Sequence, residues 1–236
     1  MCLKCARLEP RSPNESPQQT NPQGKASKTM NRLIALLTSL ATLTFVGSLA
    51  QAAGISGSKH DFSSSAWNSG GQICRPCHTP HNGMASVTSA PLWNHAQTTT
   101  TFTVYSNTVS PTFQGALGGA PDITGVSKLC LSCHDGTVAL DNFGTTPTTT
   151  TMLSGSTKVG NDLSNDHPVG FVYNTALATA DGGLKDPSAT PAVSKLLFGG
   201  RVECSSCHDV HNGAGMDKLL AVNNTGSALC LTCHVK

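Results

Sequence analysis

The sequence predicts a loop-rich fold with short helices, few strands and little regular secondary structure. Aromatic residues make up only 5% of the 236 residues, and the chain contains 23 glycines and 13 prolines. A protein core of that composition would be thin for a chain of this length. Cysteines recur in a fixed pattern along the chain. This pattern points to a bound group that supplies the missing apolar surface.

Four copies of C-x-x-C-H account for eight of the ten cysteines. The pattern is that of covalent haem attachment in c-type cytochromes. Each cysteine binds one vinyl group of the porphyrin, and the histidine follows as the proximal iron ligand. A zinc site, a redox site or disulfides are the alternatives, but disulfides do not require a histidine after every second cysteine. The sequence therefore predicts four haems c, stacked and wrapped by the chain, at Cys74, Cys77 and His78; Cys130, Cys133 and His134; Cys204, Cys207 and His208; and Cys230, Cys233 and His234.

Residues 30–52 are predicted to be a secretory signal peptide. A basic start at Met30 is followed by an apolar run to Leu49, and Ala50-Gln51-Ala52 is typical of a cleavage site. A transmembrane anchor is the alternative, but the small-residue exit and the attachment motifs favour export. Residues 1–29 are polar and proline-rich. They are interpreted as a non-native extension from a wrongly assigned start, and their two cysteines receive no role.

The charge of the exported part does not indicate a nucleic-acid partner. Six of the 15 basic residues and two of the 13 acidic residues lie before residue 53. The net charge of +2 therefore becomes about −2 in residues 53–236. No basic excess remains to attract a polyanion.

An internal repeat organises residues 53–236 into one tetrahaem domain built from two dihaem modules, at about 53–150 and 151–236. The first and third motifs read C-x-x-C-H-x-x-H-N-G, and the second and fourth read L-C-L-x-C-H. Short helices are expected at Ser127–Cys133 and Ser227–His234. The threonine runs at 98–103 and 145–151 are expected to be solvated loops or edge strands.

Five further histidines are candidates for the sixth ligand position of four irons: His60, His81, His95, His167 and His211. Neutral imidazole is a strong axial ligand. Methionine is the rival ligand, but the available methionines occupy no repeat position. All four irons are therefore predicted to be bis-histidine. His95 has no repeat counterpart and is treated as the spare, although the sequence leaves open whether the spare is His60, His95 or His167.

The repeat also gives an expected pairing. His60 and His167 precede the first and third motifs, so they are expected to bind those two haems. His81 and His211 lie three residues after a proximal histidine and cannot reach the far face of their own haem. His211 is expected to bind the haem on Cys130 and Cys133. His81 is expected to bind the last haem, on Cys230 and Cys233, of a neighbouring subunit, in a head-to-tail contact that yields an open filament.

Several stretches of the chain resemble one known family. They are SKHDFS (58–63), CHTPHN (77–82), APLWNHA (90–96), KLCLSCHDGTVALD (128–141), LSNDHPVGF (163–171), VECSSCHDVHN (202–212) and SALCLTCH (227–234). These stretches are similar to the OmcE-type tetrahaem extracellular cytochromes, which are nanowire subunits of metal-reducing bacteria. The resemblance implies a secreted polymer with a continuous chain of haems, and electron transfer to extracellular acceptors such as metal oxides.

Three functions are consistent with four haems. The first is a polymeric extracellular conduit that receives electrons from periplasmic or outer-membrane donors. The second is a soluble periplasmic tetrahaem shuttle. The third is a multihaem enzyme, which needs an iron with an open distal position. The surplus of histidines marks no open position, so the sequence predicts an electron carrier rather than an enzyme, and the resemblance favours the conduit.

Overall fold

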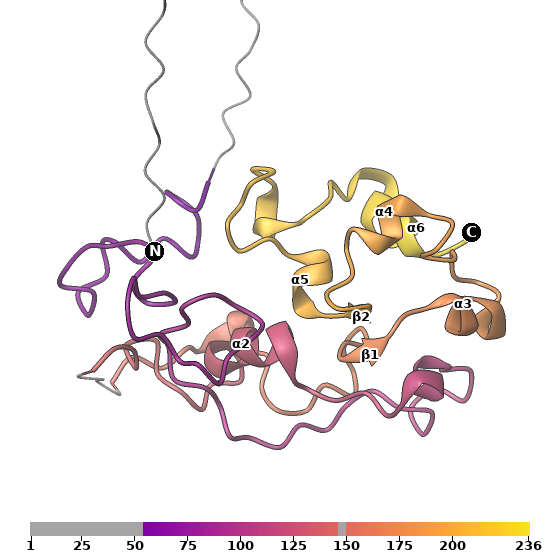
Figure 1. Cartoon of the computed structure of the whole chain (residues 1–236), viewed down its shortest axis with the longest axis horizontal. Coiled ribbons are helices and arrows are strands. Elements are labelled where there is room, and N and C mark those ends of the chain that lie inside the picture. Colours follow the sequence, from indigo (N-terminus) through magenta and orange to yellow (C-terminus); the bar gives the residue numbers. More distant parts are fainter. Residues whose placement is uncertain (1–53, 146–149) are drawn as a thin grey trace, which may run out of the picture. The chain divides into compact units, whose positions relative to one another are not determined.

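The computed structural model describes residues 54–145 and 150–236, which belong to one compact unit. The predicted extension, the signal peptide and its cleavage site lie outside the described residues. Within those ranges the chain is mostly loop, with short helices and one two-stranded sheet (Figure 1). The predicted loop-rich fold class is confirmed.

The helices and strands are all short. The α-helices are α2 (Gly125–His134), α3 (Thr175–Asp181), α4 (Pro191–Ser194), α5 (Cys204–Cys207) and α6 (Ala228–Cys233). The strands are β1 (Phe171–Val172) and β2 (Arg201–Val202), and single 3₁₀ turns cover Gly115–Gly118, Gly155–Thr157, Asp217–Leu219 and Thr225–Ser227. The two helices expected from the sequence correspond to α2 and α6.

The larger apolar cluster lies in the second module. β1 and β2 pair antiparallel, with Phe171 opposite Val202. Their inner side chains pack with α3 and α4, and the members are Phe171, Tyr173, Leu177, Ala178, Val193 and Val202, with Cys233 of α6 packed against them. The C-terminal attachment helix is therefore fixed to this cluster, and Figure 1 shows α4 and α6 side by side.

A smaller apolar cluster lies in the first module. Val87, Trp93 and Leu129 are buried together, and Cys77 packs against them. The backbone of the loop after the first motif closes on itself, because the Thr79 amide donates to Leu92 O at 2.9 Å and the Met84 amide donates to Trp93 O at 2.8 Å. The first motif and α2 therefore share one small core.

The threonine runs behave only partly as expected. Thr98 is 1% exposed, its amide donates to Ser132 Oγ at 3.1 Å, and its hydroxyl lies 3.1 Å from Thr137 Oγ1. The expectation of a solvated run is wrong at this residue, because α2 covers the start of the run. Part of the second run lies outside the described residues. No helix in residues 54–145 and 150–236 combines the length and apolar character needed to span a membrane.

Candidate haem-attachment sites

Each motif is built on one helical turn that ends at its histidine. The His78 amide donates to Cys74 O at 2.8 Å, the His208 amide to Cys204 O at 3.1 Å and the His234 amide to Cys230 O at 3.0 Å. His134 is the last residue of α2. The turn brings both cysteines and the histidine close together, which covalent attachment to one porphyrin requires.

The thiols of all four motifs are free. The eight cysteines of the described residues form no disulfide. Burial raises the pKa of Cys77 to about 11 and that of Cys133 to about 12. Cys130 and Cys204 differ, because their thiols are hydrogen-bonded to each other, which raises the pKa of Cys130 and lowers that of Cys204 to about 7. Attachment to the two vinyl groups of a haem requires two free thiols in each motif.

Main-chain carbonyls orient three of the proximal histidines. His78 Nδ1 lies 2.7 Å from Pro91 O, His134 Nδ1 lies 2.8 Å from Thr157 O, and His208 Nδ1 lies 3.0 Å from Lys218 O. A carbonyl can only accept, so Nδ1 carries the proton and Nε2 keeps its lone pair for a metal. The carbonyl partners had no signal in the sequence, since any residue type supplies one.

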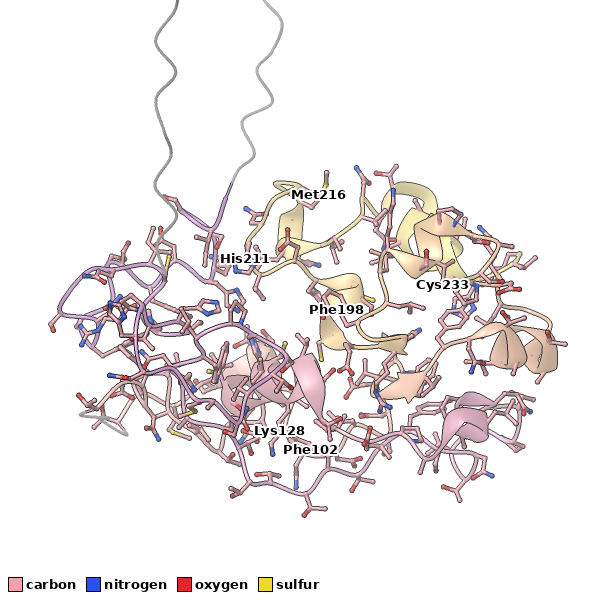
Figure 2. All side chains as sticks on the ribbon, viewed as in Figure 1. Phe102, Lys128, Phe198, His211, Met216 and Cys233 are labelled. Carbon is pink, nitrogen blue, oxygen red and sulfur yellow. The ribbon has the colours of Figure 1, made fainter. Side chains whose placement is uncertain are left out.

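Three histidine pairs have the separation expected for two ligands of one iron. The ring centroids of His60 and His134 lie 6.0 Å apart, those of His78 and His211 lie 6.3 Å apart, and those of His167 and His234 lie 6.3 Å apart. Two imidazoles that each bind a metal at about 2 Å place their centroids roughly 6 Å apart. Figure 2 shows His211 beside the loops of the first module.

These pairs differ from the pairing expected from the repeat. His60 lies beside His134 rather than His78, and His167 lies beside His234 rather than His208. His211 lies beside His78 rather than His134. His167 lies beside His234 because it is close to the start of β1. The apolar cluster around β1 has Cys233 packed against it, which brings the last motif near His167.

The residues around His60 and Trp93 also fit a haem. Burial, and then the neighbouring His134 and His208, lower the pKa of His60 to about 4, so its imidazole is neutral and able to bind iron. Trp93 is 8% exposed, its ring lies 5.9 Å from that of His78, and its Nε1 has no partner among the described residues. A buried indole N–H needs an acceptor, and a haem carboxylate at this motif could supply one.

The last motif faces an open hollow. It has a volume of about 510 Å³ and is lined by Gly226, Ser227, Cys230, Leu231, His234 and Lys236. This volume falls within the usual range for cofactor sites. The thiols, the oriented imidazoles and the hollow together fit covalently bound haem c.

His95 and His81 are the histidines outside these pairs and motifs. His95 is 2% exposed, with Nδ1 2.8 Å from Ala96 O and Nε2 3.0 Å from Ala139 O. Nε2 also lies 3.6 Å from Cys133 Sγ, so the His95 ring joins its own loop to the region of the second motif. His81 is exposed and, like the proximal His208, contacts no other histidine ring among the described residues.

The comparison with protein families agrees with this site. Residues 198–236 match the family model of the doubled CXXCH motif, which spans the third and fourth motifs. No curated protein sequence matches the chain. The match, the four motifs and the loop-rich fold support a multihaem c-type cytochrome. The motifs imply covalently bound haem c, and multihaem cytochromes of this kind carry electrons.

Proposed function

We propose that this protein is an OmcE-type extracellular electron conduit. Four bis-histidine haems carry electrons along each subunit, and the subunits polymerise into a filament. The observation that supports this most directly is the set of histidine pairs at 6.0–6.3 Å. Each haem, when bound, supplies an iron that accepts and releases one electron. Two imidazoles hold that iron in either oxidation state, so no ligand has to exchange.

The three pairs follow one rule of the repeat. The histidine at the start of each module pairs with the second motif of the same module, as His60 does with His134 and His167 with His234. The histidine after the first motif of the second module, His211, pairs with the first motif of the preceding module, at His78. The same rule requires His81 to pair with a preceding module that one chain does not contain.

A neighbouring subunit supplies that module in our proposal. Its His208 is the proximal histidine that the rule assigns to His81, and among its own chain's described residues the His208 ring contacts no other histidine ring. The acceptor of His81 thus changes from the last haem, expected from the sequence, to the haem on Cys204 and Cys207. The contact remains head-to-tail and open-ended, which yields a filament.

The surface around His81 suits such a contact. The side chains of Met84 and Leu92 on the same loop are 40% and 51% exposed. Leu92 has a φ of +52°, and a side chain at Gly83 would approach the Leu92 Cα to 2.5 Å. The loop that carries His81 is therefore closely packed and exposes apolar side chains, which suits a self-association surface.

Export completes the proposal. The signal-peptide pattern at residues 30–52 supports secretion through the periplasm to the outer surface. Periplasmic or outer-membrane proteins would donate electrons, and metal oxides or other extracellular acceptors would receive them. Nucleic acid is not a proposed partner.

The test compares His81→Ala with His211→Ala, which removes the repeat-related histidine. Both variants should keep four attached haems, and each should have one high-spin iron per subunit by electron paramagnetic resonance. Only His81→Ala should abolish filaments in electron micrographs, because His211 acts within the chain. Added imidazole should restore the low-spin signal in both variants without restoring filaments in His81→Ala.

A soluble periplasmic shuttle is the alternative. It predicts a monomer by light scattering in which all four irons are low-spin and His81→Ala changes neither property. That result would overturn the filament proposal and leave the multihaem class intact.

A further inference from the structure

One buried carboxylate lies outside the haem-ligand set. Glu203 is 2% exposed and directly precedes the third motif. Its Oε2 accepts from the Ser127 amide at 3.1 Å and from the Ser127 hydroxyl. Its side chain also accepts from the Ser206 amide, while the Glu203 amide donates to Ser206 Oγ at 2.9 Å. A group that accepts from several donors and faces a cation is an ionised carboxylate.

Glu203 joins the second and third attachment helices. Ser127 belongs to α2, and its hydroxyl oxygen accepts from the Cys204 amide of α5 at 3.0 Å. Cys130 lies in α2 and Cys204 is the first residue of α5, and the two helices are in contact. The carboxylate therefore contacts both of the helices that carry the second and third attachment motifs.

The guanidinium of Arg201 lies beside Glu203 and also contacts a second carboxylate. Arg201 Nε lies 3.5 Å from Glu203 Oε1, and the same guanidinium bonds to Asp122 and to Gly170 O. Asp122 is 55% exposed on its side chain, whereas that of Glu203 is 2% exposed. One arginine thus faces two carboxylates, of which only the buried one is poorly screened by water.

We propose that Glu203 is a positioning residue that holds the second and third attachment helices together and lowers the reduction potentials of the haems anchored at Cys130 and Cys204. This inference rests on haem attachment at those two cysteines, which belongs to the proposed function. A fixed negative charge in a poorly screened site favours the oxidised iron, which carries one more positive charge than the reduced iron.

The test is Glu203→Gln in the intact holoprotein, followed by spectroelectrochemical titration. Glutamine keeps the shape and an acceptor oxygen for Ser127 but removes the charge. Two of the four one-electron components should be reduced more easily than in the wild type. Their ratio of reduced to oxidised iron at a given potential should rise about tenfold, which corresponds to an increase of about 59 mV in midpoint potential. The other two should move by less than about twofold.

Two further variants separate charge from structure. Asp122→Asn removes a charge from the same arginine at an exposed position and should shift the same components much less. Glu203→Asp keeps the charge and should leave the potentials near those of the wild type, even if shortening the side chain lowers thermal stability.

Haem content and spin state are measured for every variant. If the wild type lacks haems at Cys130 or Cys204, the proposed function fails first. If all haems are present and low-spin but the Glu203→Gln titration overlays that of the wild type, the proposal for Glu203 is wrong. Equal shifts in Glu203→Gln and Glu203→Asp would also overturn it, because contact rather than charge would then set the potentials.

Discussion

Single histidines in this chain have distinct environments, and these environments define their roles. His60 is buried and held neutral, whereas His81 is exposed on a packed loop. His95 has carbonyl oxygens at both ring nitrogens. A neutral imidazole with one free nitrogen can bind iron, whereas both nitrogens of the His95 ring face main-chain carbonyl oxygens.

His95→Ala should therefore reduce stability without changing the haems. The substitution leaves Ala139 O, which lies 3.0 Å from His95 Nε2, without its donor. Leaving a buried acceptor unpaired costs about 1–3 kcal/mol, measurable as a lower thermal unfolding midpoint. All four irons should remain low-spin. A new high-spin signal in this variant would show that His95 binds iron.

The short elements depend on local features that single substitutions can remove. The side chain of Asn174 caps α3 by accepting from the Leu177 amide at 3.0 Å, and Gly182 ends the helix with a φ of +70°. A helix of this length has few internal hydrogen bonds, so its caps contribute a large share of its stability.

Asn174→Ala should destabilise the protein by about 1 kcal/mol, because the first turn of α3 loses its acceptor. Chemical denaturation of the holoprotein measures this change. Asn174→Asp keeps an acceptor at the same position and serves as the control. Equal losses in both variants would mean that the cap does not stabilise α3.

Gly170 directly precedes β1 at a close backbone crossing. Its φ is +76°, and a Cβ there would clash with the carbonyl oxygen of Asp122. The Asp122 amide also donates to Gly170 O at 2.9 Å. This crossing joins the first module to β1, which belongs to the larger apolar cluster.

Gly170→Ala should destabilise the protein more than Gly160→Ala, by about 1–3 kcal/mol from overpacking at a site that cannot relax. Gly160 is the matched control, because its φ is +86° but nothing lies within 4 Å of its Cβ position. Thermal unfolding of both variants gives the comparison. A loss no greater than that of the control would contradict the close approach.

The whole molecule is organised by its four attachment sites. The described residues contain two small apolar clusters, and each of them includes a haem-attachment cysteine. Attached haems would therefore add the apolar surface that these small clusters lack, as the low aromatic content suggests.

The protein should accordingly contain four covalent haems after maturation in a competent host. Intact-mass spectrometry of protein matured in a competent host should show the processed polypeptide plus four haem groups, even after acid–acetone extraction, because thioether bonds survive that treatment. Replacing Cys230 and Cys233 with alanine should remove one haem and leave three. Fewer than four haems in the wild type would contradict the reading of the motifs.

The helices at the second and fourth motifs, and the lack of long regular elements among the described residues, could be predicted, since they depend on residues close in the chain. Which histidine rings lie side by side could not be predicted. His60 lies nearer in sequence to His78 than to His134, yet it packs beside His134. Glu203 was also missed, because nothing in the sequence shows that Ser127 lies against it.

The sequence alone determined where haem is attached, because two thiols and a histidine act together when fixed spacing places them on one turn. It also determined the repeat, and hence that the distal histidines should obey one rule in both modules. Only the tertiary structure shows which histidine rings lie together. That proximity depends on which loops are brought together, and here packing of β1 against Cys233 brings His167 to His234, while His211 of the third motif's loop lies beside His78 of the first.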